Sequence, residues 1–138
     1  MSRIMAIDYG TKKTGIAVTD PLKIIANGLD TVPTNQLMDF FEEYFFTETV
    51  ETMVFGEVTR ADGTPGSNHE KIQKLMKHIS TKYPNIKMTT FDESFTSLRA
   101  KEIIMKSGVK KKKRRDKSLV DKISAILILQ DYMEANGI

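Results

Sequence analysis

The order of apolar segments along the chain is the feature that most restricts its fold. Three short strand-like segments, at residues 4–7, 14–19 and 23–29, follow one another near the N-terminus. Their connections are too short for a crossover helix, so neighbouring segments must pair antiparallel. The turn after the first segment contains Gly10, which is free to adopt a positive φ. This part of the sequence therefore predicts a three-strand antiparallel meander, with Asp8 directly after its first strand.

After the meander, helical and strand-like patterns alternate. Apolar residues at helical spacing follow Pro33 and Ser67, and Ser67 with Glu70 matches a capping box. The expected elements are helices beginning near residues 33, 67, 96 and 118, and strands over 52–55 and 86–91. The sequence thus predicts an α/β protein: a mixed five-stranded sheet flanked by about four helices, in a single domain over residues 1–138.

Composition excludes several classes of site. The 138 residues include no cysteine, so disulfides, zinc–thiolate sites and thiol nucleophiles are ruled out. The most apolar run, 123–129, is far shorter than the roughly 20 residues that cross a bilayer. The N-terminus also lacks the apolar stretch of a signal peptide. We therefore expect a cytoplasmic protein without membrane association.

Positive charge is concentrated in one segment. Residues 106–117 hold eight basic residues and one acid, Asp116, whereas the whole chain has a net charge of only +3. A dense basic segment is a candidate contact for nucleic-acid phosphates, and a solvated loop is the alternative. The expected nucleic-acid-binding residues are Lys12, Lys13, Lys110, Lys111, Lys112, Lys113, Arg114 and Arg115.

Three acids occupy positions where an α/β domain can gather distant side chains. Asp8 ends the first strand, Glu93 follows the last strand beside Asp92, and Asp121 lies in the first turn of the last helix. Carboxylates brought together repel one another unless a cation binds, and Mg²⁺ or Mn²⁺ prefers such oxygen ligands. Two ions of this kind can stabilise both oxygens of a phosphodiester displacement.

Each acid also has a structural alternative. Asp8 could close an Asx-turn, and Glu93 or Asp92 could cap a helix. Asp121 fits a capping box with Ser118, although it shares a helical face with small residues that would let the helix approach the sheet. The residues alone leave these alternatives open.

Four sequence blocks occur together in an order typical of one known family. They are DYGTKKTGIAVTD at 8–20, Gly56 with DGT at 62–64, DESFTS at 92–97, and DKISAILILQ at 121–130. On these blocks the chain resembles the YqgF family, also called RuvX, over almost its whole length. Four blocks in order are more specific than any one of them.

The resemblance implies an RNase H-like fold related to the RuvC Holliday-junction resolvases. It implies metal binding and catalysis by Asp8, Glu93 and Asp121, with Mg²⁺ or Mn²⁺ as cofactor. The family is provisionally described as nucleases that mature the 5′ end of 16S rRNA, and earlier as Holliday-junction resolvases. The resemblance therefore implies a nuclease of pre-16S rRNA processing in ribosome biogenesis.

The chain departs from the family pattern at three places. Ser94 replaces an arginine, Lys13 replaces another, and Glu57 stands where the family has G-L-P after the fourth strand. Lysine keeps the charge of arginine but loses its bidentate geometry. Glu57 is either an additional metal ligand or a solvent-facing loop acid. His69, at a helix start, is expected to be exposed, and phosphate contact is its alternative.

The expected partner is nucleic acid, structured RNA in preference to branched DNA, and the expected state is a monomer or weak homodimer. One alternative is a resolvase of four-way DNA junctions, which needs two active sites and hence a dimer. The other is a nucleic-acid-binding module without catalysis.

Overall fold

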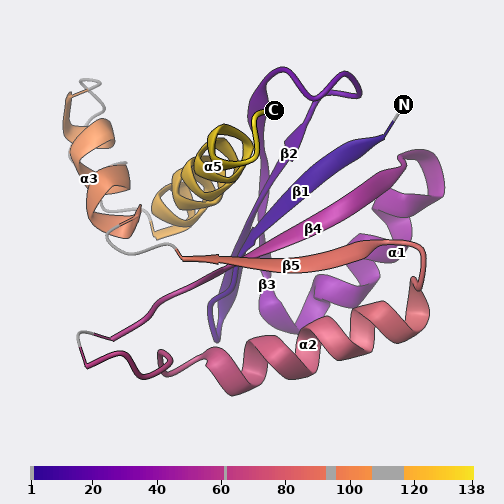
Figure 1. Ribbon diagram of the computed structural model, residues 1–138, viewed down its shortest axis with the longest axis horizontal. Coiled ribbons are helices and arrows are strands. Elements are labelled where there is room, and N and C mark those ends of the chain that lie inside the picture. The colour runs from indigo at the N-terminus through magenta and orange to yellow at the C-terminus, as the bar shows by residue number, and fades with distance from the viewer. Residues whose placement is uncertain (1, 61, 93–95, 107–116) are drawn as a thin grey trace.

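Five strands form one mixed sheet in the order β3-β2-β1-β4-β5 (Figure 1). A computed structural model describes residues 2–60, 62–92, 96–106 and 117–138, the last two ranges without the side chains of 96–98, 117 and 118. Strand β1 pairs antiparallel with β2 and parallel with β4, while β3 and β5 form the edges. The strands are β1 (Arg3–Asp8), β2 (Lys13–Thr19), β3 (Ala26–Pro33), β4 (Val50–Glu57) and β5 (Lys87–Asp92).

Helices cover both faces of the sheet (Figure 1). Helices α1 and α2 lie on one face and α5 on the other, while α3 packs beside α5 and away from the sheet. In the part of the chain that the structure describes, none of the helices combines the length and apolar character that a bilayer crossing requires. The predicted architecture, a meander plus two further strands with flanking helices, is confirmed. The helical elements are the 3₁₀ turn η1 (Thr34–Gln36), α1 (Leu37–Thr47), α2 (His69–Lys82), α3 (Thr96–Lys106) and α5 (Lys117–Ala135).

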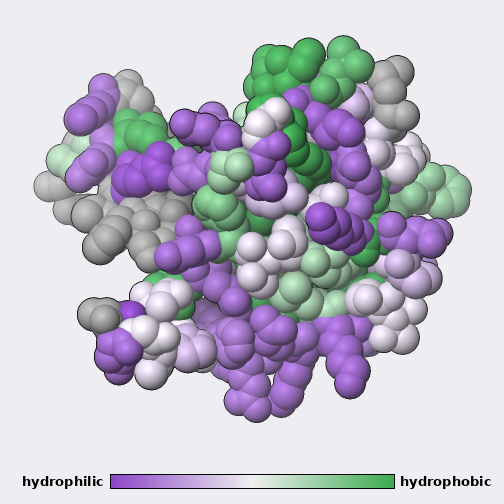
Figure 2. Space-filling model, in the orientation of Figure 1, coloured by the Kyte–Doolittle hydropathy of each residue, from purple (hydrophilic) through white to green (hydrophobic). Residues whose placement is uncertain are grey.

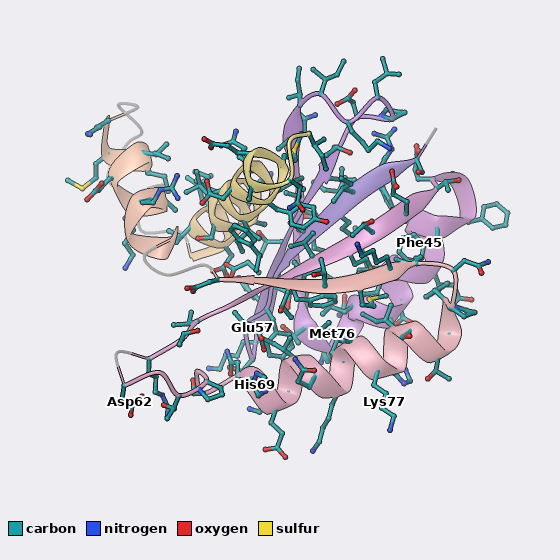
Figure 3. The ribbon with its side chains drawn as sticks, viewed as in Figure 1. Phe45, Glu57, Asp62, His69, Met76 and Lys77 are labelled. Carbon is teal, nitrogen blue, oxygen red and sulfur yellow. The ribbon has the colours of Figure 1, made fainter. Side chains whose placement is uncertain are left out.

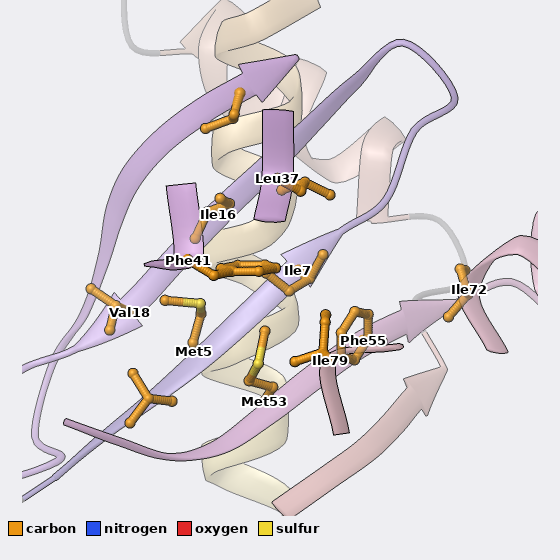
Figure 4. Packing of buried hydrophobic residues seen from close by; sticks show 12 residues of the cluster. Met5, Ile7, Ile16, Val18, Leu37, Phe41, Met53, Phe55, Ile72 and Ile79 are labelled. Atoms are coloured by element: carbon orange, nitrogen blue, oxygen red, sulfur yellow. The ribbon is translucent and has the colours of Figure 1, made fainter. Parts of the chain in front are cut away.

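The alternation of side chains along β1 divides the core into two layers. Met5 and Ile7 point toward α1 and α2, in a cluster with Phe41 and Phe55 (Figure 4). Ile4 belongs to the cluster beneath α5. Successive residues of a strand face opposite sides of the sheet, so a central strand covered on both faces is apolar throughout. This explains the continuous apolar run that precedes Asp8.

The third strand and the first helix begin later than the sequence predicts. Strand β3 pairs with β2 as far as Pro33, so this proline ends a strand instead of opening a helix. The preceding loop is held by the Asp20 carboxylate, which accepts hydrogen bonds from the amides of Leu22, Ile24 and Ile25. These bonds, the one from Ile25 above all, keep the pKa of Asp20 below its usual value. They also fold these residues into a loop, so the strand starts only at Ala26.

Two buried hydroxyl groups give a matched test of this packing. Ser124 on α5 is fully buried, and its Oγ has no hydrogen-bond partner within the described residues. Ser124→Ala should therefore raise the free energy of unfolding by about 1 kcal/mol. Thr19 is equally buried, but its Oγ1 accepts the Ile4 amide at 3.0 Å. Thr19→Val should lower the same quantity by about 1–2 kcal/mol, because the Ile4 amide loses its acceptor.

Urea unfolding of both variants measures the two changes. Destabilisation by Ser124→Ala would contradict this expectation and would mean that the Ser124 hydroxyl has a partner that stabilises the fold.

Candidate active site

Asp8 lies at the end of β1, on the face of the sheet that α5 covers. Ala6 and Ile4, two and four residues before it, belong to the cluster beneath α5, so strand alternation directs Asp8 to the same face. Asp8 is partly buried and stands directly opposite Gly15 of β2. The most central strand thus holds the Asp8 carboxylate at the end of the sheet where β1 and β4 finish.

Asp121 reaches the same place from the fifth residue of α5, just past the first turn in which the sequence predicts it, because the helix already begins at Lys117. The absent side chain of Gly15 allows this approach, because a Cβ there would lie 2.1 Å from the Asp121 carbonyl oxygen. Asp121 is only 5% exposed, so it is packed between the helix and the sheet. Asp8 and Asp121 are therefore both neighbours of Gly15, one across the strand pair and one across the helix–sheet contact.

The turn that follows Asp8 is held in place from β3 and η1. The Thr34 hydroxyl donates to the Gly10 carbonyl oxygen at 2.6 Å and the Thr34 amide donates to the Lys12 carbonyl oxygen at 2.8 Å. Gly10 does not adopt the positive φ that is open to it. Its lack of a side chain is required for another reason, since a Cβ would lie 2.3 Å from the Lys13 carbonyl oxygen. Lys12 on this turn and Lys13, the first residue of β2, are both exposed.

The remaining predicted site residues, Glu93 and the basic residues 110–115, lie outside the described residues. Within the described ranges no three Asp, Glu or His side chains are grouped closely enough to hold a metal ion. The two candidate ligands that the structure describes nevertheless have the chemistry that a divalent ion requires. Asp8 and Asp121 offer hard carboxylate oxygens in a partly desolvated setting, which is what Mg²⁺ and Mn²⁺ prefer.

A structured loop follows β4 at the same end of the sheet. Its arms are joined by an antiparallel bridge between Thr59 and Pro65, and the Gly66 amide donates to the Val58 carbonyl oxygen at 2.8 Å. At the tip, Asp62 accepts hydrogen bonds from the amide and hydroxyl of Thr64. These bonds, the one from the hydroxyl first, lower the pKa of Asp62. The D-G-T block thus forms the turn of this loop.

Glu57 lies on the opposite face of the sheet from Asp8. As the last residue of β4 it follows Met53 and Phe55 in alternation, and both belong to the cluster beneath α1 and α2. Its Oε1 lies 2.8 Å from Nδ1 of His69 (Figure 3). Neither alternative given for Glu57, an additional metal ligand or a solvent-facing loop acid, anticipates this pair.

The start of α2 also differs from the prediction. The helix begins at His69 with Asn68 as N-cap residue, and Asn68 makes no side-chain capping bond. The predicted capping box between Ser67 and Glu70 is therefore absent. With the helix beginning at His69, the ring of this residue lies beside Glu57 at the end of β4.

A profile of the RuvX family, described as Holliday junction resolvase, matches residues 2–135. The chain belongs to the RuvX family. Two bacterial relatives extend the match over the full length, and each is provisionally named a pre-16S rRNA nuclease. The protein of Christiangramia forsetii is 51% identical over 133 residues, covering 96% of this chain and 98% of the relative. That of Phocaeicola vulgatus is 47% identical, covering 98% and 97%.

The fold of this RuvX protein resembles that of a solved nuclease complex. Thermus thermophilus RuvC, bound to a Holliday junction substrate, superposes with a TM-score of 0.53 and covers 99% of this chain and 97% of its own. Sequence identity is 14%, so the likeness concerns the fold alone. It confirms the RNase H-like, RuvC-related architecture that the sequence resemblance implies.

Proposed function

We propose that this RuvX protein is a metal-dependent nuclease that hydrolyses phosphodiester bonds in structured RNA, and that its substrate is the 5′ end of pre-16S rRNA. The observation that carries the proposal is the approach of α5 to the sheet, which makes both Asp8 and Asp121 neighbours of Gly15. These two acids come from distant parts of the chain, and a bound cation would offset the repulsion between their carboxylates.

The protein's own residues hold the ion and the substrate. Asp8 and Asp121, with Glu93 as the proposed third ligand, hold Mg²⁺ or Mn²⁺. The chemistry that such an ion supplies is charge stabilisation on phosphoryl oxygens and activation of water. Lys12 and Lys13, both exposed where the turn after Asp8 enters β2, hold the substrate backbone, and the basic residues 110–115 extend this contact.

Two considerations favour RNA as substrate. The full-length relatives in Christiangramia forsetii and Phocaeicola vulgatus carry the name pre-16S rRNA nuclease. The proposed contacts are lysines on a turn, which neutralise phosphates without reading bases. Recognition of an RNA by its shape, as in folded rRNA precursors, fits such contacts.

Cleavage of a 5′-extended 16S rRNA fragment tests the proposal. The purified protein with Mg²⁺ or Mn²⁺ should shorten the 5′ extension, and EDTA should lower the rate by at least about a hundredfold. An unstructured RNA of equal length and a four-way DNA junction serve as matched substrates. Light scattering on the same preparation gives the oligomeric state, which we propose to be a monomer or weak homodimer.

Two results would contradict the proposal. Symmetric cutting of the junction by a dimer, with the RNA left intact, would identify a resolvase. Binding of the RNA without cleavage under any divalent ion would identify a binding module.

A further inference from the structure

A small pocket lies on the α2 side of the sheet, at the end where β1 and β4 finish. Tyr9, the residue after Asp8, lines it together with the end of β4 and the start of α2. The pocket has a volume of about 70 Å³, well above the roughly 10–15 Å³ that one water molecule needs on the same measure. It therefore has room for the oxygens of a phosphate group. Its lining residues are Tyr9, Gly56, Glu57, Val58, Gly66, Ser67, Asn68, His69 and Ile72.

The Glu57–His69 pair leaves one ring nitrogen of the histidine available. Nδ1 of His69 lies 2.8 Å from Glu57 Oε1, and a carboxylate can only accept, so Nδ1 carries a proton. In the described part of the chain Nε2 has no protein partner. The carboxylate is mostly buried while 42% of the His69 side chain is exposed. The arrangement fixes the ring and leaves Nε2 for a group outside the protein.

We propose that His69 binds a phosphate of the nucleic-acid backbone through Nε2, close to the phosphodiester that is cleaved, and that Glu57 positions the ring. The inference rests on the proposed nuclease function and adds a substrate contact on the face of the sheet that α2 covers, opposite to the face of Asp8. A ring that donates from both nitrogens, Nδ1–H to the Glu57 carboxylate and Nε2–H to a phosphate oxygen, is an imidazolium, so the contact with phosphate is a charge-assisted hydrogen bond. His69 is then a substrate-binding residue and Glu57 a positioning residue.

The location of the pocket favours a backbone phosphate as its occupant. Tyr9 lines the pocket, and the preceding residue, Asp8, faces the side on which the metal ion is proposed to bind. A nucleic-acid strand cleaved beside Asp8 therefore has its neighbouring phosphates close to the pocket. The surface over α2, along the lower edge of the molecule in Figure 2, is strongly hydrophilic. Helix α2 contains four lysines and a single acid, Glu70. A strand that leaves the pocket along α2 therefore meets positive charge.

The alternative is that the pair only fastens the start of α2 to β4. A partly exposed ion pair contributes little to stability, so His69→Ala should change the melting temperature by no more than about 3 °C. Substrate affinity separates the two roles, because loss of a helix anchor without a phosphate contact leaves affinity unchanged.

Binding of a fluorescent RNA hairpin with a 5′ extension, measured by anisotropy in EDTA to prevent cleavage, tests the proposal. His69→Ala should raise the Kd about tenfold, the effect of one charge-assisted hydrogen bond. His69→Gln retains an N–H donor at the end of its side chain and should recover most of the affinity. His78→Ala is the matched control, since His78 lies exposed on the same helix, and should leave the Kd unchanged.

A second measurement locates the contact. Neutral methylphosphonate linkages are introduced into the RNA one at a time. One position should weaken binding by the wild-type protein about tenfold and leave binding by His69→Ala unaffected, because the two changes remove the same contact. Additive losses at every position, or an unchanged Kd for His69→Ala, would overturn the inference.

The outcomes also separate this inference from the proposed function. If His69→Ala binds and cleaves RNA like the wild type, the phosphate contact is wrong and the nuclease proposal stands. If the wild-type protein neither binds nor cleaves RNA, both are wrong.

Discussion

Asp8→Asn is expected to lower the rate of RNA cleavage about a thousandfold, and Asp121→Asn to lower it to a similar extent. Asparagine has nearly the shape of aspartate but lacks its charge, so each change removes one anionic ligand while leaving the packing in place. Asp8 is partly buried and Asp121 is 5% exposed, so water cannot fully replace the lost ligand. The measurement is the single-turnover rate at saturating Mg²⁺.

A readout independent of activity accompanies this prediction. A ligand that binds only the folded state raises the melting temperature, so Mg²⁺ should raise it for the wild type and not for Asp8→Asn. Asp30→Asn is the matched control, because Asp30 is an exposed aspartate of β3 in the same sheet. It should retain both the cleavage rate and the response to Mg²⁺.

Undiminished Mg²⁺-dependent cleavage by Asp8→Asn would contradict the proposed mechanism. A variant that is inactive yet still stabilised by Mg²⁺ would point to a metal site elsewhere in the protein and leave Asp8 with a different role.

The architecture could be predicted because local patterns in this chain agree with its tertiary contacts. The apolar run before Asp8 is buried on both faces of a central strand, which is the environment that such a run indicates. The helix predicted to begin near residue 96 begins at Thr96 in the structure. In both segments, burial and propensity favour the same conformation, so sequence reasoning succeeds.

Errors occurred where a side chain outweighs the local pattern. The Asp20 carboxylate organises the loop before β3, and the strand then continues through Pro33 because β2 offers it a partner. Ser67 and Glu70 match a capping box, but the helix starts beyond Ser67. These outcomes depend on hydrogen bonds from neighbouring elements, which a local motif does not encode.

The site could be predicted only in part. The sequence points to Asp8 and Asp121 through their motifs, and Glu93 lies outside the described residues. The Glu57–His69 pair could have been suspected from one signal, since alternation along β4 puts Glu57 on the face that α2 covers. The role of Gly15 could not be anticipated, because a glycine inside a strand does not reveal which backbone lies over it.

Gly15→Ala should lower the melting temperature by about 10 °C, which corresponds to a loss of about 3 kcal/mol in the free energy of unfolding. The new Cβ would lie 2.1 Å from the Asp121 carbonyl oxygen and 3.1 Å from the Lys122 nitrogen. Both are backbone atoms of α5, so the helix itself must move away from β2. Thermal unfolding followed by circular dichroism measures the change.

The same displacement should reduce activity well below the melting temperature. Asp121 moves with α5, and a shift of roughly 1 Å in a catalytic group can lower a rate about a hundredfold. Gly28→Ala is the matched control on β3, because its Cβ would meet flexible side-chain atoms of Lys122 and Ile126 at 2.8–3.0 Å. Those atoms can rotate aside, so we expect a stability loss of about 1 kcal/mol or less and full activity. Equal effects of the two substitutions would show that Gly15 does not control the position of Asp121, and the geometric basis of the proposed metal site would then be wrong.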